Sequence, residues 1–404
     1  MNRYSEHFLM NAEEIKIYAK EVTHYFSDEE ELEATEIGDG NINYVFKVWN
    51  PKTGKSLIIK QADKFLRSSG RPLDINRNRI EAEILKIEGT LAQSFVPQIY
   101  HYDGTMCALS MEDISEYKNL RTELLSGKCF PHLADNISTF LADTLLPTTD
   151  LVIDSADKKE RVSRCINKDL CDITEDLVFT EPYYNYKNRT RNKNIILKEN
   201  EIFVENNLYN NERLKSEVGI LREGFMNHAQ ALIHGDLHSG SIFANEKGIK
   251  VIDPEFAFYG PMGYDVGNVI GNLFFAWGNK YYTECNNLEF LCWIEESIKD
   301  TFNIFKKKFS EKYDVLVNFN LYNSYFKEHY VKEVLADSLG YAGTEIIRRV
   351  VGDSKVLEVT SIKKLEQRIP FERALIKIGI SLIMNRYRFI TGSDITEEFK
   401  LIVS

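Results

Sequence analysis

The 404-residue chain lacks the features that mark membrane, secreted and metal-cluster proteins. No unbroken apolar run approaches the ~20 residues that span a bilayer, and residues 1–7 contain no apolar signal region. The six cysteines form no Cys-x-x-Cys pair and no cluster with histidine. These absences predict reduced thiols in a cytoplasmic protein that has no membrane partner.

Positive charge is also scarce. Lysine and arginine number 50 against 61 acidic residues, which gives a net charge of −11 at pH 7. This balance argues against nonspecific binding to nucleic acid or to anionic membranes, so any phosphate site must be local. The chain shows no internal repeat and no low-complexity linker, and 43% hydrophobic residues can form a full core. The length suits roughly two or three domains, or one bilobal enzyme.

Three carboxylates lie in two short polar segments, each bordered by apolar, strand-like runs. Asp236 lies in Ile-His-Gly-Asp-Leu-His-Ser-Gly-Ser (233–241), and Asp253 and Glu255 lie in Val-Ile-Asp-Pro-Glu (251–255). Phosphoryl transfer from ATP needs one carboxylate that orients and deprotonates a hydroxyl and others that hold magnesium. Taken singly, Asp236 also suits a helix cap, and Asp253 also suits a turn before proline.

The residues between these acids predict a β-hairpin. Two apolar runs, 241–244 and 249–252, flank the turn Asn-Glu-Lys-Gly (245–248). Because a hairpin brings its ends together, Asp236 and Asp253 are expected to converge. We interpret His234 and His238 as packing and hydrogen-bonding groups that hold the loop, without a catalytic role.

The first part of the chain predicts a small β-rich region followed by a hinge. Its expected elements are a helix at 11–23, a strand ending near residue 37, strands at 42–48 and 56–61 joined by a turn at 50–54, a helix at 77–88, and an antiparallel pair at 98–102 and 108–114. The hinge residues, whose backbone groups can bind an adenine edge, are Met111, Glu112, Asp113 and Ile114.

A phosphate-binding site is expected in this region. Gly38 and Gly40, followed by Asn41, form a turn whose backbone N–H groups can approach a phosphate. Lys60, at the end of a strand, matches the lysine that grips the ATP phosphates in kinases. The alternative for Lys60 is a lysine lying along an edge strand. The first choice for its carboxylate partner is Glu81, and the second is Glu83.

The remainder of the chain predicts mainly helices. Long periodic stretches lie at 131–146, 201–230, 264–277, 287–309 and 371–390. The predicted fold class is therefore α+β, a bilobal, protein-kinase-like architecture. We expect residues 1–113 to form the nucleotide-binding lobe with its hinge, and residues 114–404 to form a larger, mainly helical lobe for catalysis and substrate binding.

The chain resembles the methylthioribose kinases, within the aminoglycoside-phosphotransferase and choline-kinase branch of the kinase-like fold. The segments that carry the resemblance are 38–43, 111–113, 182–186, 229–241, 253–265 and 347–349. Protein kinases have an asparagine five positions after the catalytic aspartate and an Asp-Phe-Gly metal motif. This chain has Ser241 and Asp253-Pro254-Glu255 there, so the resemblance implies a kinase of small molecules.

The resemblance also implies a reaction and a role for each site residue. The family reaction transfers the γ-phosphate of ATP to the anomeric hydroxyl of 5-methylthioribose, giving 5-methylthioribose 1-phosphate in methionine salvage. By carry-over, Asp236 is the catalytic base, Asp253 and Glu255 bind Mg²⁺, and Arg348 and Arg349 contact the sugar. A homodimer is the expected assembly.

One departure from the family and several alternatives remain. Relatives usually carry a Trp-Pro pair where this chain has Arg71 and Pro72, which leaves room for a related sugar such as 5-deoxyribose. Arg348 and Arg349 argue against cationic acceptors such as choline or aminoglycosides, although two surface arginines are an alternative. A nucleotide-binding pseudokinase is disfavoured by the complete catalytic set, and a protein kinase by the lack of an activation-loop phosphosite.

Overall fold

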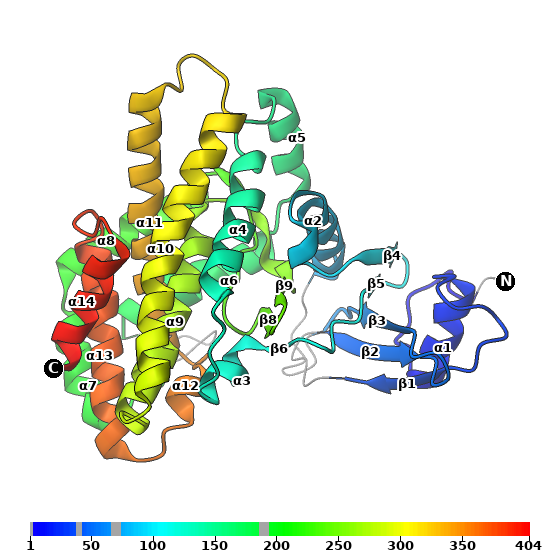
Figure 1. Ribbon diagram of the computed structural model, residues 1–404, viewed down its shortest axis with the longest axis horizontal. Helices are drawn as coiled ribbons and strands as arrows, with labels where there is room; N and C mark the ends of the chain where they lie inside the picture. The colour runs from blue at the N-terminus through cyan, green and yellow to red at the C-terminus, as the bar shows by residue number, and fades with distance from the viewer. Residues whose placement is uncertain (1–2, 38–42, 66–73, 186–193) are drawn as a thin grey trace. The chain divides into compact units, whose positions relative to one another are not determined.

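The computed structural model describes residues 3–37, 43–65, 74–185 and 194–404. They form two compact units, and Figure 1 labels most of their helices and strands. The first contains Met1–Tyr117 and Lys250–Ala257, and the second contains Lys118–Ile249 and Phe258–Ser404. The division thus lies near the predicted boundary after residue 113. The segment 250–257, which carries Asp253 and Glu255, belongs to the first unit.

An antiparallel sheet forms the centre of the first unit. Its five strands lie in the order β1-β2-β3-β5-β4. The elements are α1 (Ala12–Glu21), β1 (Glu33–Glu36), β2 (Tyr44–Trp49), β3 (Ser56–Gln61), α2 (Arg77–Leu91), β4 (Ile99–Asp103) and β5 (Ala108–Met111). Each strand and helix that the sequence predicted here is present, so the β-rich first part is confirmed.

The turn between β2 and β3 shows why these strands pair in their observed register. The Asn50 side chain accepts hydrogen bonds from the backbone N–H groups of Lys52 and Thr53, at 2.9 and 3.2 Å. Gly54 follows with φ of +74°, a left-handed conformation that glycine adopts without strain. The turn thereby aligns Val45 with Lys60 across the two strands.

Alternation along β3 assigns its side chains to opposite faces of the sheet. Ile59 and Phe46 belong to the buried cluster that includes Tyr18 of α1. Lys60 therefore points to the other face, where Glu81 of α2 hydrogen-bonds to it. The period-two pattern of the sequence thus separates a packing face from a polar face.

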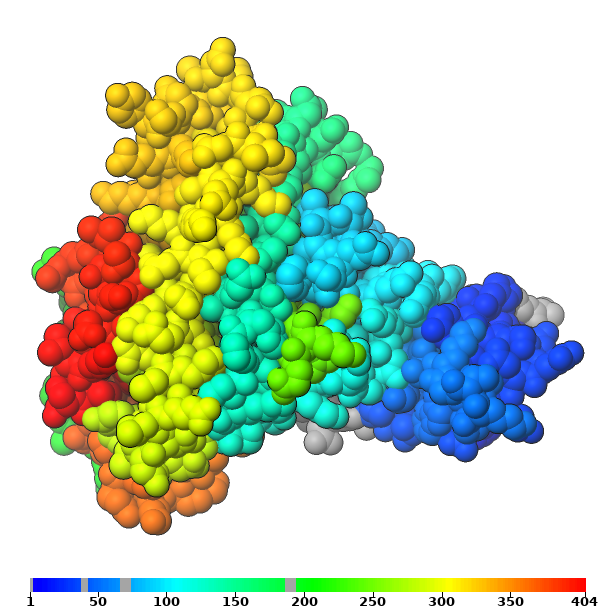
Figure 2. Space-filling view, viewed as in Figure 1, coloured from blue at the N-terminus to red at the C-terminus, as the bar shows by residue number. Residues whose placement is uncertain are grey.

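Helices dominate the second unit, and α10 lies against α4 and α14 on the face shown in Figure 2. The helices are α3 (Leu120–Leu125), α4 (Leu133–Leu145), α5 (Ser155–Arg164), α6 (Lys168–Phe179), α7 (Glu201–Val204), α8 (Glu212–Asn227), α9 (Gly263–Thr283), α10 (Leu288–Leu316), α11 (Ser324–Val351), α12 (Leu357–Thr360), α13 (Leu365–Met384) and α14 (Gly392–Val403). Within the described ranges, no helix is long and apolar enough to cross a membrane.

Some helix predictions were wrong in detail. The predicted helix at 201–230 is broken, because a π-helical turn at Glu205–Tyr209 ends the first piece and the Asn211 side chain caps α8 at the Leu214 N–H, 3.0 Å away. The predicted helix at 371–390 instead spans Leu365–Met384. Sequence reading missed α11, because much of this helix is buried on nearly every side and shows no continuous polar stripe.

Among the described residues, five short strands follow β5 along the chain. β7 (Ala231–Ile233) pairs antiparallel with β10 (Phe258–Gly260), and β6 (Lys118–Asn119), β8 (Ile242–Asn245) and β9 (Gly248–Val251) form a three-stranded sheet. The predicted hairpin is therefore confirmed as β8 and β9. Its turn is held by the Asn245 side chain, which accepts hydrogen bonds from the N–H groups of Lys247 and Gly248 at 2.7 and 3.2 Å.

Helices α9 and α11 approach each other closely because a glycine lies at their contact. A Cβ atom at Gly267 would overlap the carbonyl oxygen of Ser338 and lie 2.7 Å from the backbone nitrogen of Ala342. Both atoms belong to the backbone, so the helices themselves would have to separate. This close approach positions the C-terminal turns of α11.

We expect Gly267→Ala to lower the free energy of unfolding by about 2 kcal/mol or more, because overpacking against backbone atoms forces the helices apart. The matched control is Gly219→Ala in α8, where an added Cβ meets nothing within 4 Å. That change should stabilise the protein by about 0.5–1 kcal/mol, since alanine loses less backbone entropy in a helix. Urea unfolding followed by circular dichroism measures both. Equal changes in the free energy of unfolding in the two variants would contradict the close packing of α9 against α11.

Candidate active site

Three carboxylates lie around one ammonium group in the first unit. The Lys60 Nζ donates to Glu81 Oε1 at 2.8 Å and to Asp253 Oδ1, and Glu255 adds its charge nearby. Lys60 and Glu81 are almost fully buried, whereas the Asp253 side chain is 43% exposed. The pairing of Lys60 with Glu81 is therefore present, and Glu83 instead pairs with Arg79 at 2.6 Å.

The excess of negative charge affects how these groups titrate. Burial lowers the pKa of Lys60, but Asp253, Glu81 and Glu255 together raise it above its ordinary value, so the ammonium stays protonated. Burial raises the pKa of Glu81 to about 7, against the lowering effect of Lys60. The two cations, Lys60 and Arg77, cannot compensate three carboxylates, so the most buried acid holds its proton more tightly.

The acid Glu255 is held by two further side chains. Asn43 donates to Glu255 Oε2 at 3.2 Å, and the Arg77 Nε lies 3.7 Å from the same oxygen. Arg77 also donates to Asn43 Oδ1 at 3.1 Å, which closes a triangle. Burial raises the pKa of Glu255, although Lys60 and Arg77 act in the opposite direction.

Asp253 and Glu255 lie on one tight turn. Asp253 has φ of +63°, a left-handed conformation that aspartate tolerates better than most residues, and Pro254–Phe256 form a 3₁₀ turn directly after it. Magnesium usually takes only one or two protein carboxylates and keeps water and phosphate oxygens as its other ligands. Two acids beside a surplus of negative charge therefore suit this cation. Across the described residues there is no group of three or more His, Cys, Asp or Glu side chains able to hold a metal ion.

The other residues predicted to bind nucleotide fall in two groups. Gly38, Gly40 and Asn41 lie outside the described residues, as does Arg71. In the predicted hinge, Met111 is the last residue of β5, the Glu112 N–H donates to the Gln98 carbonyl at 2.8 Å, Asp113 pairs with Lys47 at 2.7 Å, and the Ile114 carbonyl accepts from Tyr117 at 2.8 Å. The Glu112 N–H is therefore engaged within the protein.

In the second unit, the loop after β7 is held by a carboxylate that sequence reading did not single out. The Asp265 side chain accepts hydrogen bonds from the backbone N–H groups of His234 and Gly235, at 2.7 and 3.0 Å. Gly235 has φ of +80°, so a side chain there would be strained. Ser241 Oγ donates to the Asp236 carbonyl at 3.1 Å. These bonds determine where the Asp236 carboxylate lies.

Asp236 has three cationic or hydrogen-bonding neighbours. Arg348 Nη2 and Arg349 Nη2 lie 3.5 and 3.6 Å from its Oδ1, and the His238 Nε2 lies 3.4 Å from its Oδ2. Burial by itself raises the pKa of Asp236, but His238, Arg349 and Arg348 lower it well below its ordinary value. Asp236 is therefore an ionised carboxylate, able to accept a hydrogen bond or a proton from a hydroxyl group.

The hydrogen bonds of His238 indicate which of its nitrogens carries the proton. Its Nδ1 accepts from the backbone N–H groups of Gly240 and Ser241, at 2.9 and 3.2 Å. A nitrogen that accepts N–H groups carries no proton, so the N–H of the ring lies on Nε2, the atom that faces Asp236. These bonds agree with a loop-holding role, and the contact with Asp236 adds a role in orienting that carboxylate.

Glu345 holds both arginines from the preceding turn of α11. It accepts from the Arg348 Nε and, at 3.0 Å, from the Arg349 Nε. Burial by itself raises the pKa of Glu345, but the two guanidinium groups lower it to about 2. The side chains of Arg348 and Arg349 are only 9% and 11% exposed, so the alternative of two surface arginines is wrong.

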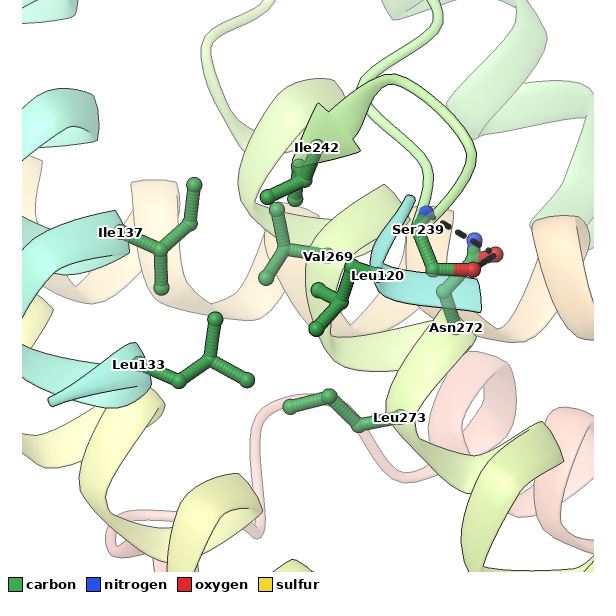
Figure 3. A pocket seen from close by; sticks show the side chains of 8 residues that line it. All are labelled: Leu120, Leu133, Ile137, Ser239, Ile242, Val269, Asn272 and Leu273. Carbon is green, nitrogen blue, oxygen red and sulfur yellow. Dashed lines mark hydrogen bonds between the residues drawn. The ribbon is translucent and has the colours of Figure 1, made fainter. Parts of the chain in front are cut away.

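An asparagine links this clamp to the loop that carries Asp236. Asn272 of α9 accepts from Ser239 N–H and Oγ at 3.4 and 3.2 Å (Figure 3), and its amide donates to Glu345 Oε1 at 3.3 Å. Apolar side chains, including Ile137 and Ile242, line a cavity of only about 10 Å³ beside Ser239. The loop is therefore closely packed behind Ser239.

Several of these residues escaped sequence reasoning. Asn43, Arg77, Asp265, Asn272 and Glu345 contact the predicted acids or arginines, or the loop that carries Asp236. Only Glu345 carried a usable signal, because its spacing to the two arginines matches neighbours on one helix face. The others come from distant segments. The convergence of Asp236 with Asp253 joins the two units and stays a prediction.

Glu345→Gln should lower the free energy of unfolding by about 3 kcal/mol at neutral pH, because it leaves buried guanidinium charge without its partner. The native pKa of Glu345 is about 2 and its ordinary value is 4.5, so its stabilisation is complete above 4.5 and is lost as the pH falls towards 2. The difference in free energy of unfolding between Glu345→Gln and wild type should therefore shrink as the pH falls from 4.5 towards 2.

Urea unfolding at neutral pH and at several acidic pH values measures this difference. Glu366→Gln is the control, since Glu366 is exposed in the first turn of α13, and such surface changes usually stay within about 0.5 kcal/mol. A difference in free energy of unfolding between Glu345→Gln and wild type that did not change with pH would contradict this. It would show that the charge of the Glu345 carboxylate does not stabilise its contacts with Arg348 and Arg349.

Known proteins match the chain over nearly its full length. The model of the phosphotransferase enzyme family matches residues 207–286. The methylthioribose kinase of Bacillus velezensis is 37% identical over 94% of the chain and 93% of its own length. Those of Bacillus pumilus and Escherichia coli are each 35% identical; they cover 91% and 92% of the chain, and 91% of their own lengths.

Among solved structures, an ethanolamine kinase of Plasmodium vivax aligns with 95% of the chain and 93% of its own length, at 14% identity and a TM-score of 0.48. The sequence relatives decide the assignment, because each exceeds 30% identity over more than nine-tenths of the chain. The chain belongs to the methylthioribose kinase family.

Proposed function

We propose that this protein transfers the γ-phosphate of ATP to the anomeric hydroxyl of 5-methylthioribose, giving 5-methylthioribose 1-phosphate and ADP. The observation that carries the proposal is the ionised Asp236, which faces two guanidinium groups on α11. Membership of the methylthioribose kinase family supports the choice of acceptor. The reaction is a step of methionine salvage.

On the acceptor side, Asp236 takes the proton of the sugar hydroxyl. The hydroxyl oxygen forms a bond to the γ-phosphorus, and the bond between that phosphorus and the β–γ bridging oxygen breaks, so that ADP leaves. Arg348 and Arg349 contact the sugar and stabilise negative charge around the transferred group. His238 orients the Asp236 carboxylate, and the Glu345 clamp holds the two arginines.

On the donor side, Lys60 contacts the phosphates of ATP, and Glu81 orients its ammonium. Asp253 and Glu255 would hold Mg²⁺, which when bound neutralises charge on the phosphate oxygens. Their surplus of negative charge supports this assignment. Further backbone contacts are proposed for two sets of residues: Gly38, Gly40 and Asn41 with the phosphates, and residues 111–114, apart from the engaged Glu112 N–H, with the adenine.

The arginine pair also separates this proposal from other acceptors. Cationic substrates such as choline or aminoglycosides need acids or aromatic faces, and two guanidinium groups repel them. A 5-deoxyribose kinase is the second candidate, because that sugar has the same anomeric hydroxyl and Arg71 replaces an aromatic residue usual in relatives. We also propose that the protein is a cytoplasmic homodimer.

An acceptor panel tests the function. With ATP and Mg²⁺, purified protein is assayed for ADP release with 5-methylthioribose, 5-deoxyribose, ribose, choline and kanamycin. We expect the highest kcat/KM with 5-methylthioribose. Asp236→Asn should lower kcat about 10²–10⁴-fold, because the amide cannot accept the proton. Preference for choline or kanamycin, or activity of Asp236→Asn close to wild type, would overturn the proposal.

The pairing of Lys60 yields a prediction with an internal control. Glu81→Gln should raise the Michaelis constant for ATP and lower kcat, since the ammonium loses a charged hydrogen-bond partner worth about 1.5–3 kcal/mol, or roughly 10–100-fold. Glu83→Gln lies on the same helix and breaks only the pair with Arg79, so its kinetics should match wild type. Equal losses in both variants would assign the effect to the helix rather than to Lys60.

Arg349 should act on the acceptor and not on ATP. Arg349→Ala should raise the Michaelis constant for the sugar, lower kcat, or do both, by about tenfold or more, with little change in the ATP response. Arg349→Lys should recover little, because lysine keeps the charge but lacks the planar fork that lies between Glu345 and Asp236. A weakened ATP response with a normal sugar response would move this arginine to the nucleotide side.

A further inference from the structure

A second cavity lies in the second unit and shares no lining residue with the group around Asp236. It encloses about 580 Å³, within the range of roughly 300–1,000 Å³ that is usual for small-molecule sites. Helices α10 and α11 and the segment between α13 and α14 form its walls. The part of α11 that lines it ends at Ala336, more than two helical turns before Glu345.

The cavity is cationic, although the chain as a whole is acidic. Its charged lining residues are Lys306, Lys327, Lys332, Arg386 and Glu328, four cations and one acid, against a net charge of −11 for the whole chain. Lys327 pairs with Asp314 at 2.7 Å. Among the described residues, no carboxylate lies within ion-pair distance of the Lys306 or Lys332 ammonium. Two positive charges are thus left for an anion.

Arg386 is the buried cation of the cavity wall. It is only 5% exposed, and its Nε is fully buried without a hydrogen-bond acceptor in the described structure. Its Nη1 donates to Glu217 at 2.7 Å and to the Ile383 carbonyl at 2.9 Å. A buried guanidinium N–H without an acceptor is costly, and native proteins rarely leave one so. The buried Nε does not open into the cavity, so Arg386 contributes other atoms to the cavity wall, and its charge is paired with Glu217.

The remaining lining is apolar and partly aromatic. The α11 side contributes the buried residues Val331, Leu335 and Ala336. Across from α11, the segment after α13 contributes Tyr387, Phe389 and Ile390, and Tyr387 and Ile390 are 48% and 64% exposed. These large side chains are exposed next to cations that have no ion-pair partner among the described residues. Such a surface suits a ligand with one apolar end and one anionic end.

We propose that this cavity is a second binding site, which takes a small amphipathic anion: a carboxylate that carries an apolar or aromatic tail. The tail packs between Leu335 and Ile390, and the carboxylate lies at Lys306 and Lys332. The site is separate from the sugar and nucleotide sites and does not depend on the proposed reaction.

Calorimetric titration of the full chain tests the proposal with three probes that share one tail: 4-phenylbutyrate, 4-phenylbutan-1-ol and 4-phenylbutylamine. The carboxylate should bind with a Kd of about 1 mM or tighter. The alcohol should bind at least about tenfold more weakly, because it lacks the charge that the cations attract. The amine should bind more weakly still. Saturation with 5-methylthioribose should leave the affinity for the carboxylate unchanged.

A charge-reversed variant and a matched control locate the site. The double variant Lys306→Glu, Lys332→Glu breaks no ion pair of the described structure, so it should fold normally and bind 4-phenylbutyrate at least about tenfold more weakly. Lys307→Glu changes the neighbouring residue of α10, which is 73% exposed and does not line the cavity. It should bind as wild type does.

Three calorimetric results would overturn the proposal: no saturable binding of the carboxylate, equal affinity for the alcohol, or an equal loss in Lys307→Glu. Analytical ultracentrifugation of wild type and the double variant tests the alternative that a second copy of this chain fills the cavity. If the double variant dissociated an assembly that wild type forms, the cavity would be an interface between copies and the ligand proposal would be wrong. An unchanged sedimentation coefficient supports it.

Discussion

The carboxylate of Glu345 is the group on which the charge around Asp236 depends. Three and four positions along the same helix lie two arginines, and side chains at this spacing share one face. Without an anion between them, two buried guanidinium groups would repel each other and would both turn to Asp236. Because Glu345 takes the Nε atom of each, their outer nitrogens stay 3.5 and 3.6 Å from Asp236. Asp236 stays ionised and remains open to a hydroxyl group.

The packing of α9 against α11 places this clamp. Gly267 allows the two backbones to approach, and Asn272, farther along α9, bonds both Ser239 of the loop and Glu345 of the clamp. One helix thus connects the position of the base to that of the arginines. Asp265, also on α9, holds the start of the same loop through two backbone N–H groups. A shift of α9 would therefore move base and arginines together.

The first unit carries the opposite kind of charge balance. Around Lys60 and Arg77 lie three carboxylates, so the cluster has one more anion than cations. Surplus charge that is buried is unfavourable unless a partner of opposite charge binds. The raised pKa of Glu81, caused first by burial and then by the neighbouring carboxylates, reflects this unfavourable energy. A divalent cation would relieve it. The surplus of negative charge in the first unit fits its proposed role in binding a cation. The near balance of charge around Asp236 fits its proposed role in accepting a proton from the sugar hydroxyl.

The sequence by itself determined the strands of the first unit, the β8–β9 hairpin and the identity of the acids, because each depends on local patterns: alternation, turn residues and short motifs. It also chose Glu81 over Glu83 without a geometric reason. Only the tertiary structure decided between them, since a helix must pack before one of its acids faces Lys60. The same holds for Asn43, Arg77, Asp265 and Asn272, which reach the site residues across long stretches of chain. The missed helix α11 has the same cause. From Val331 to Val351 this helix is buried on nearly every side and has no continuous polar face to mark its period, so its sequence pattern alone did not reveal it.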